Sequence, residues 1–467
     1  MLQLIQQCDL SHLNYEMHIN MKITNELLES VLGIVDCPSF MAKRISIDSK
    51  DITGGELFIA LNRGHEFVKQ ALDDGAIFAI IDDERYQIPK KTLLVKNTTE
   101  ILKLIGKYIK EKIGLKKIVG ITGSVGKTST RSWLNSVLKN KFNSFSSIKN
   151  YNTIYGLPIS LSLLEDGADF GIFEMGTNNP GEISELSEYL EPDIGIITNI
   201  YESHIGRFEN RDNLADEKIS IINGIKSNGT LIFDGDSEFA NKINYAAKSR
   251  GLNTISVGFS NDCDFLIKSY DKNIEVKTPI GIVQYNISIL GKHFAYITAC
   301  ILAAIYAMNL DIFDFLPFFK NLSQVNGRGT IIKHTFEDKI FNVIDDSYNA
   351  SPSAVIASLE ILQSMPHKSK IAVIGQMKEL GKHEIYYHKL VANKLNSMNL
   401  SHMFFIGDKK LWDIMNEQKN ILCFEKIDDF VIEKILEIIH NDSIVLLKGS
   451  RSIELNRFID YIKCSIT

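Results

Sequence analysis

Short apolar runs alternate with longer amphipathic stretches along most of the chain, and this alternation predicts an α/β protein. Residues 116–122 are apolar and β-branched, which is typical of a buried strand, and helical spacing of apolar residues follows over 129–141. The apolar runs 170–176 and 193–199 both end in polar residues. Strands and helices that alternate in this way indicate a mostly parallel sheet with helices on both faces.

The length of 467 residues and the order of these runs predict three domains. We expect a small α/β N-terminal domain over 21–108, a central P-loop-type domain over 109–314 and a Rossmann-like C-terminal domain over 315–467. Residues 1–20 carry no basic start followed by an apolar core, so no secretory signal is visible. We interpret them as an extension or a misassigned start before Met21.

Further patterns predict individual elements. Residues 71–81 indicate a helix followed by a buried strand, and 262–290 are β-rich. The apolar run 294–308 is shorter than the roughly 18 residues that a membrane helix requires, so it predicts a buried helix and no membrane span. Strands of the C-terminal domain are predicted at 370–375, 403–407 and 444–448.

Composition and charge narrow the class of protein. The net charge of −6, from 51 basic and 57 acidic residues, disfavours a general nucleic-acid binder. The six cysteines are scattered without a C-x-x-C pair, which indicates small core residues of a reducing compartment rather than disulfides or a zinc site. We therefore expect a cytoplasmic protein, and we expect it to be a monomer.

A glycine-rich stretch between the first central strand and its helix predicts a phosphate-binding loop. Glycines let backbone N–H groups approach phosphate oxygens, and the helix directs its positive end at them. Lys127 would reach the transferred phosphoryl group, and the hydroxyl of Thr128 would bind Mg²⁺. An ordinary strand–turn–helix corner is the alternative, but turns do not require Gly-Lys-Thr-Ser in that order. The predicted nucleotide contacts are Thr122, Gly123, Ser124, Val125, Gly126, Lys127, Thr128 and Ser129.

Three further residues are candidates for the same site. Glu174 ends a predicted strand next to the phosphate loop, where a carboxylate holds Mg²⁺ directly or through water; a helix cap or a solvated carboxylate is the alternative. His204 follows a strand and a turn, so it can reach the same edge of the sheet, although a lone histidine is more often structural. Lys218, taken alone in a helical stretch, would be an exposed and solvated charge.

Together these motifs resemble the Mur ligase family over residues 21–467, and within it the members that join D-alanyl-D-alanine to UDP-N-acetylmuramoyl-tripeptide. The loop 122–128 has the tighter spacing that Mur ligases share with folylpolyglutamate synthases. The other matching motifs are Asn150-Tyr-Asn152 with Gly156-Leu-Pro158, Glu174-Met-Gly176 with Pro180-Gly-Glu-Ile183, Thr198-Asn199, His204 with Lys218, Asp345-Asp-Ser-Tyr-Asn-Ala-Ser-Pro352, Gly375-Gln-Met-Lys-Glu-Leu-Gly381 and Lys448-Gly-Ser-Arg451.

The resemblance implies an ATP- and Mg²⁺-dependent ligase of peptidoglycan precursor synthesis that works through an acyl phosphate. It implies that Lys218 carries a carbamate, which makes a cation into a carboxylate-like metal ligand. The implied catalytic residues are Lys127, His204 and Lys218, and the implied Mg²⁺ ligands are Thr128, Glu174, His204 and Lys218. Further implied contacts are Arg328 and Asp346 to the nucleotide, and Ser49, Lys50, Asn152, Tyr348 and Asn349 to the substrates.

The chain departs from the family pattern at three places. Lys50 replaces an arginine and cannot form the same bidentate fork. Phe294 and Ile297 stand where the family has asparagines facing adenine, so adenine would be held by stacking or by backbone groups. Arg63-Gly-His65 replaces Asp-Gly-His on the uridine side.

Other functions remain as alternatives. One is another amino acid ligase of the Mur or folylpolyglutamate type. A second is a P-loop phosphotransferase or NTPase, which is disfavoured because the chain has no Asn-Lys-x-Asp guanine reader and no arginine-rich lid. A non-catalytic paralogue is disfavoured because Lys127, Glu174, His204 and Lys218 are all present.

Overall fold

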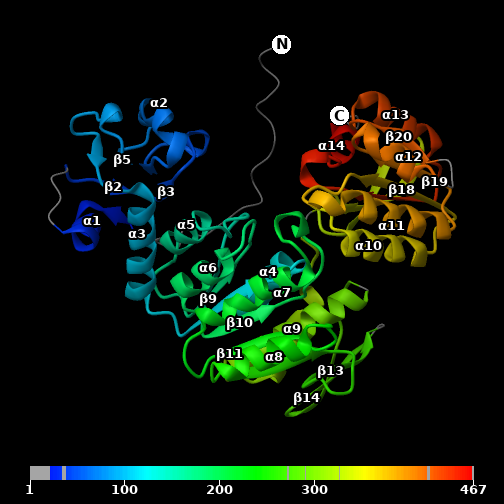
Figure 1. Cartoon of the computed structure of the whole chain (residues 1–467), viewed down its shortest axis with the longest axis horizontal. Helices are drawn as coiled ribbons and strands as arrows, with labels where there is room; N and C mark the ends of the chain where they lie inside the picture. Colours follow the sequence, from blue (N-terminus) through cyan, green and yellow to red (C-terminus); the bar gives the residue numbers. More distant parts are fainter. Residues whose placement is uncertain are drawn as a thin grey trace. The chain divides into compact units, whose positions relative to one another are not determined.

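The computed structural model of the protein describes residues 22–33, 38–270, 273–289, 291–325, 327–417 and 421–464; the extension predicted at 1–20 lies outside this part. Figure 1 shows helices and strands along the whole described chain. The chain forms two compact units. The first is built from residues up to Lys117 and from Lys141–Phe173, and the second from Ile118–Asn140 and Glu174–Thr467.

The first unit contains a four-stranded parallel sheet in the order β3-β4-β5-β6. The apolar faces of β4 and β5 meet helix α2, and Phe58, Val68 and Ala71 are buried in that contact. The helix and strand predicted over 71–81 are present, with the helix beginning three residues earlier, at Val68. The sheet and its helix are β3 (Ile45–Ser46), β4 (Leu57–Ile59), α2 (Val68–Asp73), β5 (Phe78–Ile81) and β6 (Thr92–Leu94).

Helix α3 (Thr98–Ile113) of this unit has a clear start and end signal. The side chain of Asn97 accepts from the backbone N–H of Glu100, and Gly114 ends the helix in the left-handed conformation with φ +66°. Further elements of the first unit are β1 (Ile23–Thr24), α1 (Asn25–Leu32), β2 (Met41–Ala42), β8 (Ser144–Ser146) and α5 (Gly156–Ser162). Strand β9 (Phe170–Glu174) belongs to this unit up to Phe173, and its last residue, Glu174, belongs to the second unit.

In the second unit, seven strands of one sheet follow the order β15-β14-β13-β12-β11-β10-β7. Strands β7 to β13 pair in parallel, and β14 and β15 pair antiparallel at the edge. The strands are β7 (Lys117–Thr122), β10 (Ile194–Ile197), β11 (Thr230–Asp234), β12 (Asn253–Gly258), β13 (Phe265–Tyr270), β14 (Ile274–Thr278) and β15 (Gly281–Tyr285). The helices are α4 (Lys127–Leu138), α6 (Glu182–Leu190), α7 (Arg211–Ile219), α8 (Ala240–Ser249) and α9 (Lys292–Ala307).

Helix α9 confirms the buried helix that the apolar run predicts, since most of its residues from Phe294 to Ile305 are buried. No helix in the described part of the chain is long and apolar enough to cross a membrane.

The second unit also contains a six-stranded sheet in the order β16-β17-β21-β18-β19-β20, parallel except for β16. Alternate residues of β18 enter two cores: Ala372 and Ile374 face α10 and α11, whereas Ile371 and Val373 face α13 and α14. The strands are β16 (Thr330–Phe336), β17 (Lys339–Asp346), β18 (Ser369–Gly375), β19 (His402–Ile406), β20 (Ile421–Phe424) and β21 (Ser443–Lys448). The helices are α10 (Pro352–Ser364), α11 (Glu384–Ser397), α12 (Trp412–Met415), α13 (Asp429–Ile438) and α14 (Arg457–Cys464).

These sheets confirm the α/β class and the predicted buried strands. The register of β7 and β10 matters most for the site, because Thr122 lies opposite Ile197. The two strands therefore end at the same level, and the loops that follow them begin side by side. In open parallel sheets this edge is where ligands bind.

Candidate active site

The loop between β7 and α4 has the shape of a phosphate loop. Gly123 and Gly126 have φ of +142° and +83°, which side chains rarely adopt. A Cβ atom on Gly123 would lie 1.9 Å from the hydroxyl oxygen of Thr198, so no side chain fits there. Helix α4 begins at Lys127, directly after Gly126. Its first N–H groups therefore face the loop, as anion binding requires.

The loop after β10 holds the phosphate loop in place. The N–H of Ser124 donates to the carbonyl oxygen of Asn199 at 3.1 Å, and the N–H of Val125 donates to Oδ1 of Asn199 at 2.9 Å. The hydroxyl of Thr198 donates to the carbonyl oxygen of Val125 at 2.6 Å. The Thr198-Asn199 motif thus fixes the backbone of the nucleotide loop.

Lys127 and Thr128 are the first residues of α4 and directly follow this loop. Nζ of Lys127 donates to the carbonyl oxygen of Gly123 at 2.6 Å. Burial lowers the pKa of Lys127, and the nearby carboxylate of Glu174 opposes that shift. The hydroxyl of Thr128 donates to Oε2 of Glu174 at 2.9 Å. The structure therefore brings together these three residues that the sequence assigned to one site.

Lys218 on α7 is buried, with 2% of its surface exposed, so the interpretation of this residue in isolation as a solvated charge is wrong. Burial lowers its pKa to about 7; the charge of Lys127 acts in the same direction, and Glu217 acts against it. The polar sequence of α7 gave no sign of this burial, because the packing of the unit decides which face is covered. The environment of Lys218 therefore favours the uncharged, nucleophilic form of its amine.

Glu217, which precedes Lys218, is a buried residue that sequence reasoning missed. Its carboxylate accepts from the hydroxyl of Thr177 at 3.0 Å and from the N–H groups of Gly181 and Ile183 at 2.6 and 2.9 Å. These contacts satisfy donors at the start of α6. Glu217 thereby ties α7, and Lys218 with it, to the loop that follows Glu174.

His204 contacts a carboxylate of the C-terminal sheet's loops. It follows β10 in the left-handed conformation, with φ +63°. Its Nδ1 atom lies 2.7 Å from Oε2 of Glu379, which belongs to the motif after β18. The structure thus places His204 against the C-terminal sheet's loops.

The predicted C-terminal contacts form one cluster. The guanidinium of Arg328 lies over the ring of Tyr348, 4.2 Å from its centroid, and that of Arg451 lies 5.5 Å away. Nζ of the buried Lys448 lies 2.9 Å from Oδ2 of Asp346 and donates to the carbonyl oxygen of Asn349 at 2.7 Å. Lys448 therefore sets the position of the loop that carries Tyr348. Arg328 also lowers the pKa of Lys127, so its charge acts at the phosphate loop.

Arg131 is a second residue that sequence reasoning missed. It lies one turn after Lys127 on α4 and is buried. Burial lowers its pKa; Glu174 opposes that shift, and Arg328 and Tyr348 also lie within electrostatic reach. Arg131 follows Lys127 by four residues, which puts both side chains on one face of the helix. This spacing was the sequence feature that could have identified Arg131 as a site residue.

Phe294 and Ile297 face the core instead of an open site. Phe294 is buried, and its ring centroid lies 5.4 Å from that of Trp133 on α4. Ile297 is also buried, behind Gly126 of the phosphate loop. These side chains support α4 from behind, so the ring of Phe294 is not available to stack on adenine.

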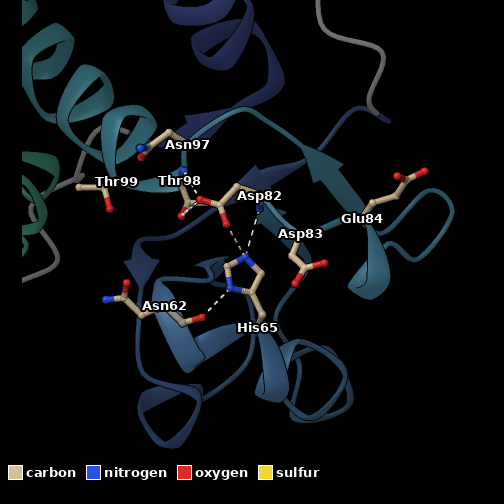
Figure 2. Close-up of a pocket in the computed structure, with 8 residues that line it drawn as sticks. All are labelled: Asn62, His65, Asp82, Asp83, Glu84, Asn97, Thr98 and Thr99. Atoms are coloured by element: carbon tan, nitrogen blue, oxygen red, sulfur yellow. Dashed lines mark hydrogen bonds and ion pairs between the residues drawn. The ribbon is translucent and has the colours of Figure 1, made fainter.

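The first unit contains a polar cavity of roughly 470 Å³ at the carboxyl ends of β4, β5 and β6 (Figure 2). His65 is buried in its wall: Nδ1 lies 2.7 Å from the carbonyl oxygen of Asn62, and Nε2 lies 2.9 Å from Oδ1 of Asp82. Asp82 in turn accepts from the N–H of Thr98 at 2.9 Å. His65 is therefore fixed to the loop after β5, and Asp82 connects that loop to the start of α3. The cavity is lined by Asn62, His65, Asp82, Asp83, Glu84, Asn97, Thr98 and Thr99.

The other predicted substrate residues also lie in the first unit. Ser49 is buried and Lys50 is exposed; the N–H of Lys50 donates to Asp48 at 3.0 Å. The N–H of Asn152 donates to the carbonyl oxygen of Asn150 at 2.8 Å.

The donors around Glu174 suit a magnesium ion. Hydroxyl and carboxylate oxygens are the hard ligands that Mg²⁺ prefers, and Thr128 and Glu174 already present both in contact. Among the described residues, no group of three or more His, Cys, Asp or Glu side chains is arranged to hold a metal ion. Of the four predicted Mg²⁺ ligands, only Glu174 and His204 are residues of these types.

Comparison with known proteins finds the same architecture. The family model of the Mur ligase middle domain matches residues 121–307, and that of the Mur ligase, glutamate ligase domain, matches residues 327–451. The UDP-N-acetylmuramoyl-tripeptide–D-alanyl-D-alanine ligase of Rickettsia prowazekii is 31% identical over 450 residues, which cover 94% of this chain and 99% of that protein. The Bacillus subtilis ligase of the same name is 27% identical, with 94% and 97% covered.

Solved structures agree with these relatives. MurF from Acinetobacter baumannii is 25% identical and superimposes with a TM-score of 0.84, covering 95% of this chain and 99% of that one. MurF ligase from Thermotoga maritima, solved in complex with ADP, is 26% identical with a TM-score of 0.76, covering 91% and 97%.

Proposed function

This chain belongs to the Mur ligase family, and on that premise we propose that it uses ATP to join D-alanyl-D-alanine to UDP-N-acetylmuramoyl-tripeptide. The observation that carries the proposal is the contact of Thr128 with Glu174, together with the charge of Lys127 in the same loop and the buried Lys218 that interacts with it. This is a site for a triphosphate and its metal. In the proposed reaction, the carboxylate of the tripeptide reacts with the nucleotide that is bound at this site.

The first step activates an inert carboxylate. An oxygen of the tripeptide's terminal carboxylate attacks the γ-phosphorus of ATP, the bond to the β-phosphate oxygen breaks, and ADP leaves. The product is an acyl phosphate. The ammonium of Lys127 and the N–H groups at the start of α4 stabilise the charge that develops on the phosphoryl oxygens. Mg²⁺, when bound, supplies further neutralisation of the same oxygens, and Thr128 and Glu174 would hold it.

The second step forms the amide. The uncharged amine of D-alanyl-D-alanine attacks the acyl carbon, and the resulting intermediate expels inorganic phosphate and loses a proton. Water must be excluded until the amine has reacted, because it would hydrolyse the acyl phosphate. The cluster of Arg328, Tyr348 and Asn349 lies in the loops of the C-terminal sheet that would cover the reaction. Arg328 and Asp346 would contact the nucleotide.

Lys218 acts in its carbamylated form. Its uncharged amine attacks carbon dioxide and releases a proton, and the product is an anionic carbamate. Two observations favour this form: the amine is buried, and its pKa is lowered to about 7 by that burial. An anion at this position also removes the repulsion between Lys218 and Lys127. With Glu174 and Nε2 of His204 it would complete a second set of Mg²⁺ ligands.

The first unit would bind the nucleotide end of the acceptor. Ser49 and Lys50 begin a short turn after β3, and Asn152 lies in the loop before α5. The polar cavity around His65 lies at the same kind of strand edge. The reaction would take place in the cytoplasm, in keeping with the scattered cysteines, and the enzyme would act as a monomer.

Mass spectrometry of the reaction products tests this function. Purified protein is incubated with MgATP, UDP-N-acetylmuramoyl-tripeptide ending in either lysine or a diamino acid, and a panel of amines. The expected product is the UDP-linked pentapeptide, formed with D-alanyl-D-alanine and not with single amino acids. Efficient addition of a single amino acid would instead support the alternative ligase type. Lys127→Ala serves as the inactive control.

A further inference from the structure

The loop that carries His204 and the motif that carries Glu379 lie in direct contact. Besides the 2.7 Å approach of Nδ1 to Oε2, the backbone N–H of Gly206 donates to the carbonyl oxygen of Glu379 at 2.9 Å. Both His204 and Glu379 have left-handed backbone conformations, with φ of +63° and +66°. Such values are uncommon outside glycine and persist where surrounding contacts enforce them.

Two glycines make this contact close. Gly206 lies in η4 (Ile205–Arg207), and Gly381 begins η8 (Gly381–His383). A Cβ atom on Gly206 would lie 2.4 Å from the backbone nitrogen of Gly381, and one on Gly381 would lie 2.8 Å from Cα of Gly206. The two segments therefore touch backbone to backbone, which fixes the distance between His204 and Glu379.

A second contact holds the same loop. The hydroxyl of Ser353, in the first turn of α10, donates to Oε2 of Glu202 at 2.6 Å. Glu202 lies two residues before His204, and it is buried. The loop is thus attached to the elements of the C-terminal sheet at two independent points. A merely incidental approach of one surface side chain would not show this pattern.

The contact with Glu379 determines which ring nitrogen of His204 is free to serve a reaction. A histidine that serves a reaction through one ring nitrogen is oriented by the partner of the other, and a carboxylate partner also raises its basicity. Glu379 occupies the Nδ1 side of His204, so Nε2 is the nitrogen that remains. The approach is close but poorly aligned for a regular hydrogen bond, since Nδ1 has no partner with hydrogen-bond geometry among the described residues.

We propose that Glu379 is a positioning residue, which holds Nδ1 of His204 so that Nε2 is the ring nitrogen presented to the reaction. The inference rests on the proposed function, because it gives His204 a place at the reaction centre. It adds that the packing of the C-terminal sheet against the loop at 202–206 also sets the orientation of His204.

Four variants test the proposal: Glu379→Ala, Glu379→Gln, His204→Ala and the double variant His204→Ala/Glu379→Ala. Glu360→Gln is the matched control, because Glu360 is an exposed glutamate of helix α10 that pairs with Lys394 at 2.8 Å and does not contact His204 in the described structure. Three quantities are measured: kcat of amide formation, the affinity of the ADP-loaded protein for Mn²⁺ by electron paramagnetic resonance, and the melting temperature.

The expected result is a loss of about 10- to 100-fold in kcat and in Mn²⁺ affinity for Glu379→Ala, which is the usual effect of removing such a partner. Glu379→Gln should lose less, because its amide oxygen can occupy the same place beside Nδ1. The double variant should be no worse than His204→Ala alone, since Glu379 acts through His204. Melting temperatures and the Glu360→Gln control should stay close to those of the wild type.

Two results would overturn the proposal: Glu379→Ala with kcat and Mn²⁺ affinity within twofold of the wild type, or a double variant whose losses multiply. A failure of the proposed function can be distinguished from a failure of the positioning role of Glu379. In that case the wild type makes no pentapeptide, yet the Mn²⁺ measurements on Glu379→Ala and His204→Ala still report whether the two residues act as one.

Discussion

The hydroxyl of Thr128 donates to Oε2 of Glu174 at 2.9 Å, although 46 positions separate the two residues in the chain. Thr128 lies in the first turn of α4, and Glu174 is the last residue of β9. A carboxylate at this place is stabilised by the positive end of the helix. On the proposed function, this pair would anchor the cation that accompanies ATP.

Glu174→Gln keeps the shape of this anchor and removes its charge. We expect kcat of ligation to fall by at least about 10-fold and the Mg²⁺ concentration for half-maximal rate to rise, because an amide oxygen is a poorer ligand than a carboxylate. Thr128→Ser, which keeps the hydroxyl, should stay near the wild type. Rates measured over a Mg²⁺ series check both variants, and a Mg²⁺ dependence that does not change in Glu174→Gln would contradict this assignment.

Lys218→Ala removes the proposed carbamate. Ligation should fall by about 10-fold or more, and added formate or acetate should restore part of it by supplying a free carboxylate in the vacated space. Lys218→Arg cannot form a carbamate and should not respond to the acids. Initial rates with and without the acids decide the matter: wild-type ligation by Lys218→Ala under both conditions would exclude the carbamate.

The buried amine of Lys218 also predicts a pH dependence of stability. Its pKa is about 7 in the folded protein and 10.5 as a reference value, so between these limits the unfolded chain binds more protons. The stability of the wild type should therefore rise with pH across this window relative to Lys218→Met. In buffer free of carbon dioxide, the variant should melt above the wild type at pH 7, and the gap should shrink towards pH 10. A gap that is independent of pH would show that the amine is not buried.

Phe294→Ala tests the placement of this ring in the core. Removing it leaves a cavity against Trp133, and we expect a loss of stability of about 3–5 kcal/mol. The KM for ATP should change far less than the stability, since the ring does not face the nucleotide. Urea unfolding and ATP kinetics on the same preparation separate the two effects. A large rise in KM without loss of stability would restore the stacking role.

The sequence predicted those parts of the site that depend on local pattern. Lys127 and Thr128 follow from the glycine-rich loop between strand and helix, and Glu174 follows from its place at a strand end. The buried helix α9 followed from its length and apolar composition.

The rest depends on contacts between distant segments. Lys218 lies in a helix of mostly polar residues, so periodicity gave no reason to bury it. Glu217 is an ordinary glutamate in the sequence. Glu379 lies in the motif 375–381, but that motif does not indicate a contact with His204. Only the packing of α7 on α6, or of one loop on another, gives each glutamate its partner, and such a tertiary contact leaves no local signal of who the partner is.

The dependence of ADP release on the acceptor tests the central claim most directly. Purified protein with MgATP is assayed for ADP with both substrates, with each alone, and with neither. Sustained ADP release should require UDP-N-acetylmuramoyl-tripeptide and D-alanyl-D-alanine together, with one ADP for each amide formed. ADP release at the full rate in the absence of the muramyl peptide would contradict the account.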